Sequence, residues 1–69
     1  MKAVLEFMLP EEAEFHKLAV EGPRWQAAMW ALDMRLRNAA KHEDKKSISI
    51  ADARAWLREE IEGLDLRLE

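Results

Sequence analysis

Four side chains in the middle of the chain are of types that together bind phosphorylated nucleotides. An aromatic ring, a thioether and two cations recur at positions i, i+4, i+7 and i+11, as Trp30, Met34, Arg37 and Lys41. On an α-helix this spacing places all of them on one face. An indole stacks on a nucleobase, and a guanidinium holds phosphate with two parallel hydrogen bonds. With Asp33 beside them, these residues form a candidate ligand site.

The same face could instead be the interface of a homo-oligomer. Its small and apolar members are Ala27, Trp30, Ala31 and Met34. In that arrangement Trp30 and Met34 are buried between subunits, and the two cations form a polar rim. Asp33 and Arg37 are four residues apart, so a weak surface ion pair is expected between them. The sequence leaves both interpretations open.

The helix that carries this face has a second apolar face. Unrolled at 100° per residue, a core stripe about 100° wide contains Trp25, Ala28, Met29, Leu32, Leu36 and Ala39. A helix that is apolar on two sides is either central in its own domain or shared with a partner. A chain of 69 residues buries only about 60% of its unfolded surface. We therefore expect a homo-oligomer.

Hydrophobic periodicity and helix-breaking residues predict a mainly α fold of the α+β class, in a single domain over residues 1–69. Residues 2–9 alternate in polarity, as a strand does. Pro10 ends that strand and begins a helix over 10–21. Gly22 can end this helix, and Pro23 suits the first turn of the next, over 23–43.

The last third of the chain predicts a third helix and a second strand. Ser49 is a good N-cap for a helix over 50–62, and Gly63 follows it. Residues 64–68 alternate again, so the terminal strands pair with each other or with those of another subunit. The expected core is Phe15, Leu18, Trp25, Leu32, Leu36, Leu57 and Ile61.

Charge is distributed unevenly along the chain. Residues 1–22 and 47–69 each have a net charge of −3, whereas residues 23–46 have +3. A net-acidic chain binds long nucleic acids poorly, but a local basic cluster can still attract a small anion. Without cysteine, a signal peptide or a membrane-spanning run, we expect a soluble cytoplasmic protein that does not bind membranes.

Residues that could support catalysis are scarce. The only serines, Ser47 and Ser49, stand at a helix start, and the only glycines, Gly22 and Gly63, cannot form a phosphate loop. Neither histidine has two further ligands at a known metal-binding spacing. We expect no enzymatic activity, no metal site and no cofactor.

A pattern of residues over 2–41 resembles short, largely uncharacterised proteins encoded by tailed phages and prophages. Those proteins have a strand, then "LPEE", "EF", a glycine, an aromatic residue, "A-x-W-x-x-D-x-x-L-R" and a lysine. The matching residues here are Phe7, Leu9-Pro10-Glu11-Glu12, Phe15, Ala19, Gly22, Trp25, Ala28, Trp30, Asp33, Leu36-Arg37 and Lys41. The resemblance implies a phage accessory protein that acts in the host cytoplasm.

Small phage proteins without catalytic residues commonly act by binding. By kind, the resemblance implies an anti-defence protein that sequesters a nucleotide immune signal, such as a cyclic nucleotide. The alternative is a protein-interaction module that inhibits or recruits a host or phage protein through the second apolar face of residues 23–43.

Overall fold

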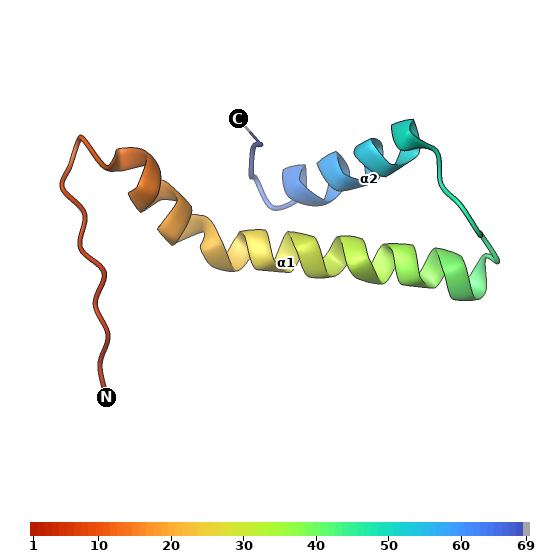
Figure 1. The fold of residues 1–69 in the computed structure, drawn as a ribbon, viewed down its shortest axis with the longest axis horizontal. Helices are drawn as coiled ribbons and strands as arrows, with labels where there is room; N and C mark the ends of the chain where they lie inside the picture. The colour runs from red at the N-terminus through yellow and green to blue at the C-terminus, as the bar shows by residue number, and fades with distance from the viewer. Residues whose placement is uncertain (69) are drawn as a thin grey trace.

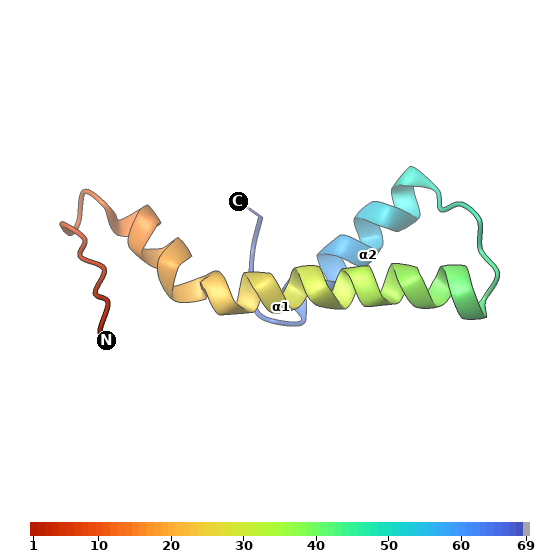
Figure 2. The same cartoon turned by 60° about the horizontal axis from the view of Figure 1, so that its bottom comes forward.

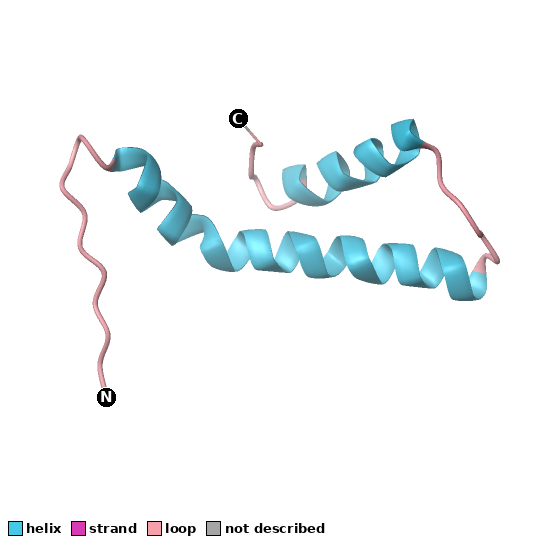
Figure 3. Ribbon diagram, viewed as in Figure 1, coloured by secondary structure: helices cyan, strands magenta, loops and turns pink. Residues whose placement is uncertain are grey.

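The computed structural model describes residues 1–68 and consists of two helices (Figure 1). Helix α1 spans Ala13–His42, and helix α2 spans Ile50–Glu62. A loop joins them, and α2 runs back along the C-terminal part of α1 as an antiparallel hairpin. Residues 1–8 form an extended arm before α1. Within the described residues there are only helices, turns and loops, as Figure 3 shows.

The two helices form a single layer. The molecule measures 49 × 31 × 16 Å, and its shortest dimension is little more than the 10–12 Å diameter of one helix with its side chains. Its radius of gyration is 16.1 Å, whereas a compact chain of this length has about 11 Å. A globular domain normally has at least two packed layers. The fold therefore leaves most of α1 uncovered (Figure 2).

Helix α1 bends near Pro23 but does not end there. A proline inside a helix removes one backbone hydrogen bond and its ring crowds the carbonyl four residues earlier, which bends the helix. The bend is visible in both ribbon views (Figures 1 and 2). Gly22 does not adopt the positive φ of a glycine cap. The separate helices predicted over 10–21 and 23–43 are therefore wrong, and a single kinked helix replaces them.

Helix α2 has the bounds predicted from the sequence, and its N-terminus is capped. The Ser49 hydroxyl accepts a hydrogen bond from the Asp52 backbone N–H at 3.0 Å. This bond satisfies one of the amides that lack a partner in the first turn.

The capping turn that follows α2 lies at Asp65, two residues after Gly63. Asp65 has a φ of 59°, in the left-handed region. Its N–H donates to the Glu62 carbonyl at 3.0 Å, and the Leu66 N–H donates to the Ile61 carbonyl at 3.0 Å. These two bonds form a Schellman motif, with the accompanying apolar contact between Leu66 and Ile61. The motif turns the chain back over α1.

The core lies where this turn meets the middle of α1. Ala28, Ile61 and Leu66 are buried together, and partly buried side chains pack around them: Trp25, Leu57 and Leu64. The small side chain of Ala28 lets α2 approach closely. Arg24 donates to the Leu64 carbonyl at 3.3 Å and so holds the end of α2 against α1.

Several core and strand predictions are wrong. Phe15 and Leu18 are 63% and 54% exposed, because α2 is too short to reach the part of α1 before the bend. Leu36, also predicted in the core, is 38% exposed. Residues 2–9 and 64–68 form no strands, since neither segment lies beside another extended segment with which to share backbone hydrogen bonds. The predicted strand, three-helix and strand arrangement is therefore replaced by a helical hairpin with an extended arm.

The arm is fixed only where it enters α1. The Met8 N–H donates to the Glu12 carboxylate at 2.8 Å, and the Glu12 N–H donates to the Met8 carbonyl at 2.7 Å. The Phe7 ring meets the His16 ring edge-on, with centroids 5.5 Å apart. Val4 and Leu5, nearer the N-terminus, are exposed.

The Schellman motif predicts opposite effects for two substitutions of Asp65. Glycine adopts positive φ without a steric penalty, whereas alanine does not. We expect Asp65→Gly to raise the free energy of unfolding by about 0.5 kcal/mol and Asp65→Ala to lower it by about 1 kcal/mol. Urea denaturation followed by circular dichroism measures both. Equal effects of the two substitutions would contradict the motif.

Candidate binding surface

The residues predicted to bind a ligand or a second subunit lie on α1, on the side opposite α2. We call this surface the outer face and define it by Trp30, Met34, Arg37 and Lys41, with Ala27, Ala31 and Asp33 at its edges. By the helical repeat, Trp30 and Arg37 lie about half a turn around the axis from the buried Ala28. The hairpin therefore leaves the outer face uncovered by α2.

Exposure differs among these residues. Trp30 is 66% exposed, which is high for an indole, and Arg37 and Lys41 are also exposed. Met34 and Ala31 are half-buried. An exposed tryptophan followed by exposed cations along one helix face is typical of a surface that binds a partner rather than of a core.

The cations of the outer face are not neutralised by residues 1–68. The ion pairs of this part of the chain involve Arg24 and Arg35 only. The weak pair expected between Asp33 and Arg37 does not form. Both Arg37 and Lys41 can therefore reach an external anion or carboxylate.

The outer face is convex and extended. Seven residues separate Trp30 from Arg37, which is about 10 Å along the helix axis. Two hollows of the described chain lie elsewhere. One follows the end of α2 and the tail after it, and the other lies beneath Lys45–Ile48, beside Trp56. Small-molecule sites are usually concave, so on a single chain the outer face resembles a docking surface more than a ligand pocket.

A second cluster, which the sequence analysis missed, joins the two helices beside the core. The Arg35 guanidinium lies 4.3 Å from the centroid of the Trp56 ring. It also bonds the carboxylate of Glu59 at 2.6 Å and that of Glu60 at 3.4 Å. Lys45 approaches the same ring, with its Nζ at 5.7 Å. No local pattern in the sequence indicates this cluster, because Arg35 and Glu59 are 24 residues apart.

The cluster orients α2 rather than presenting a reactive group. The hydrogen bond that Arg35 donates to the Glu59 carboxylate raises the pKa of the Arg35 guanidinium, so the arginine stays charged. A guanidinium that stacks on an indole while bonding two carboxylates fixes the rotation of one helix relative to the other. The cluster is therefore structural in its geometry, and the outer face remains the candidate functional surface.

Metal-ligating residues do not gather within the described chain. No three His, Cys, Asp or Glu side chains among residues 1–68 come close enough to hold an ion. Neither α1 nor α2 is apolar over a length that could cross a bilayer.

Comparison with known proteins gives no relative from which a site could be transferred. No protein family, curated protein or solved structure matches the chain. The resemblance to phage proteins stays a prediction from the residues of the sequence. The function must be argued from the surface of the molecule.

The structural role of the Arg35 cluster can be tested with one charge-neutralising substitution. We expect Glu59→Gln to lower the thermal unfolding midpoint by a few degrees at low ionic strength, and the loss to shrink in 0.5 M salt because salt screens the pair. Glu62→Gln, on the same helix but outside the cluster, is the control and should change the midpoint less. A loss that is independent of salt would mean that the ion pair does not stabilise the hairpin.

Proposed function

We propose that this chain is a non-catalytic protein-interaction module that binds another protein through the outer face of α1. The observation that carries the proposal is the exposure of Trp30 on a helix face that also bears an adaptable thioether and two exposed cations. Tryptophan, methionine and arginine are enriched at protein interfaces, and tryptophan and arginine dominate binding energies there.

The spacing of these residues favours a particular mode of recognition. Positions i, i+4, i+7 and i+11 form the stripe with which a helix enters a groove on a partner. Trp30 and Met34 supply the apolar anchors, and Arg37 and Lys41 supply cations further along the same stripe. The complementary surface is an apolar groove with carboxylates at one end. Inhibition or recruitment of a host or phage protein needs only such binding.

Sequestration of a nucleotide is a second candidate, favoured by one specific observation. Trp30 offers an exposed stacking plane, and Arg37 is free of ion pairs with residues 1–68. A cyclic or linear phosphorylated nucleotide could stack on the indole and bond the guanidinium. Because the face is convex, this function requires another chain to complete the site.

Cross-linking distinguishes the two candidate functions, because only the protein-interaction module requires the outer face to contact a distinct protein. A photo-reactive amino acid at position 30 should cross-link a distinct protein in a lysate of the source cells, while the same group at the exposed position 54 of α2 should not. The cross-linked protein, once purified, should bind the chain, and Trp30→Ala should weaken that binding at least tenfold, as expected for an anchor residue. Arg54→Ala is the matched control. Binding that Trp30→Ala leaves unchanged contradicts the proposal.

Calorimetry tests the nucleotide candidate directly. A panel of cyclic dinucleotides, cyclic trinucleotides and cyclic ADP-ribose isomers should produce heat if the chain sequesters one of them. Trp30→Ala should then remove about 1–3 kcal/mol of stacking. Arg37→Lys should weaken binding although it keeps the charge, because lysine cannot form the bidentate bond. The absence of heat at tens of micromolar protein would exclude this candidate.

A further inference from the structure

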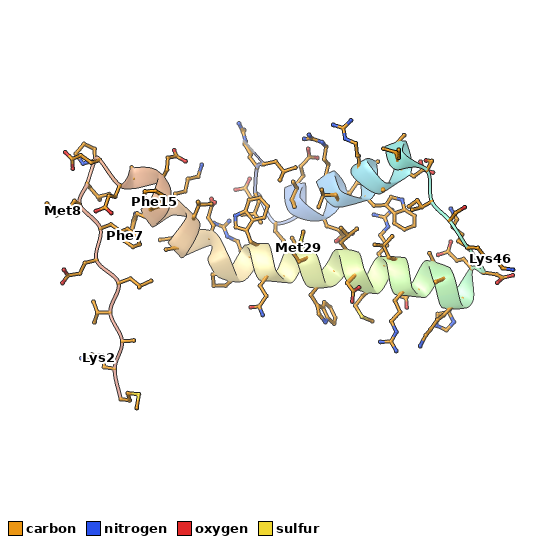
Figure 4. The ribbon with its side chains drawn as sticks, viewed as in Figure 1. Lys2, Phe7, Met8, Phe15, Met29 and Lys46 are labelled. Atoms are coloured by element: carbon orange, nitrogen blue, oxygen red, sulfur yellow. The ribbon has the colours of Figure 1, made fainter. Side chains whose placement is uncertain are left out.

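A second apolar surface of α1 lies between the side that contacts α2 and the outer face. We call it the lateral stripe and define it by Phe15, Leu18, Gly22, Met29 and Leu36. Its large side chains are 63%, 54%, 48% and 38% exposed for Phe15, Leu18, Met29 and Leu36. In Figure 4, Phe15 is labelled near the start of α1 and Met29 on the straight part after the bend. Helix α2 covers none of it fully.

The lateral stripe belongs to a heptad repeat. Positions 15, 22, 29 and 36 recur every seven residues, and positions 18, 25, 32 and 39 form the companion series. A repeat of this kind is the seam along which helices pack as coiled coils or bundles. Within the hairpin, α2 packs against the part of the companion series that follows the bend, where Trp25 contacts the core and Ala39 is buried, whereas Leu18 stays exposed. One half of the seam is therefore filled and the other half is open.

The exposed surface area of the chain is larger than that of a compact monomer of the same mass. The chain exposes 6135 Å², whereas a compact monomer of its mass exposes about 4,500 Å². The excess is about 1,600 Å² for each chain. This excess includes the exposed arm of residues 1–8 and the outer face as well as the lateral stripe. Two copies that each bury about half of it would still remove about 1,600 Å² in total, which is the size of a standard stable interface.

We propose that a second copy of this chain packs on the lateral stripe, with the two α1 helices antiparallel, so that two hairpins form a four-helix assembly. By the helical repeat, the stripe lies roughly a quarter turn from the side that contacts α2. In a four-helix bundle, the two sides of a helix that contact its neighbours are also about a quarter turn apart. The inference does not depend on the proposed target of the outer face, which stays exposed in the dimer.

Charge and side-chain size favour the antiparallel arrangement. Within α1, residues 13–22 carry a net charge of −1 and residues 23–42 carry +3, so antiparallel pairing sets the acidic end of each helix along the basic part of its partner. It can also place Phe15 opposite the partner's Leu36 and Gly22 opposite the partner's Met29. A Cβ added at Gly22 would meet nothing within 4 Å, which leaves room for a methionine from the second copy.

Helix α2 does not offer a comparable surface for the partner. Its side away from α1 is polar and exposed, with Arg54, Arg58 and Glu62. Its apolar stripe, through Leu57 and Ile61, is already used against α1. The second copy must therefore contact α1.

Light scattering tests the dimer and the position of its interface. The wild-type chain should have a mass of about 16 kDa, twice the 8.1 kDa of one chain. Met29→Glu and Leu36→Glu should each halve that mass at micromolar concentration, and Trp30→Glu, on the outer face, should leave it unchanged. A wild-type mass near 8 kDa overturns the proposal. Dissociation by Trp30→Glu alone would place the interface on the outer face instead.

Cysteine cross-linking keeps the test decisive if the glutamate variants fail to fold. The chain has no cysteine, so single cysteines report contacts without background. In the antiparallel register, position 26 lies close to the twofold axis, so Gln26→Cys should form a disulfide-linked dimer on mild oxidation. Ala40→Cys should not, because the two copies of position 40 are then about 40 Å apart. Linkage through position 40 would show a parallel dimer, and linkage through neither would overturn the proposal.

Discussion

The short length of α2 is the constraint on which the rest of the structure depends. Thirteen residues can cover only part of a helix of thirty. Ile61 and Leu66 fill the space over Ala28, and the Schellman motif at Asp65 is what brings Leu66 there. Everything else on α1 is left for solvent or for a partner. The shape of the molecule follows from this mismatch of length.

The surfaces of α1 divide its circumference into three regions with different chemistry. One side packs on α2 and is locked in rotation by the Arg35 cluster. The lateral stripe is apolar and uncharged, which suits a permanent contact that excludes water. The outer face combines Trp30 with exposed cations, and such mixed surfaces suit a contact that forms and breaks. Assembly and target binding can therefore coexist on one helix.

Part of the fold was predictable because its signals are local. Ser49 caps α2 through the Asp52 N–H as its position suggests, and α2 has the predicted bounds. Of the core stripe predicted on α1, Ala28 and Ala39 are buried, whereas Met29 and Leu36 are exposed. The break at Gly22 and Pro23 was not, because proline only bends a helix when the residues on both sides favour helix and no glycine cap forms. The alternation in residues 2–9 identified extended backbone but could not supply a neighbouring strand.

The sequence by itself determined which residue types share a face of α1, since helical spacing fixes that without any tertiary contact. It thereby placed Trp30, Met34, Arg37 and Lys41 together and opposite Ala28. Only the tertiary structure decided which faces are covered. It buried Ala28 beneath Ile61, left Phe15 and Leu18 exposed, and joined Arg35 to Glu59 across the hairpin. These contacts depend on the length of α2 and the path of the turn at Asp65, and residues far apart in the chain set both.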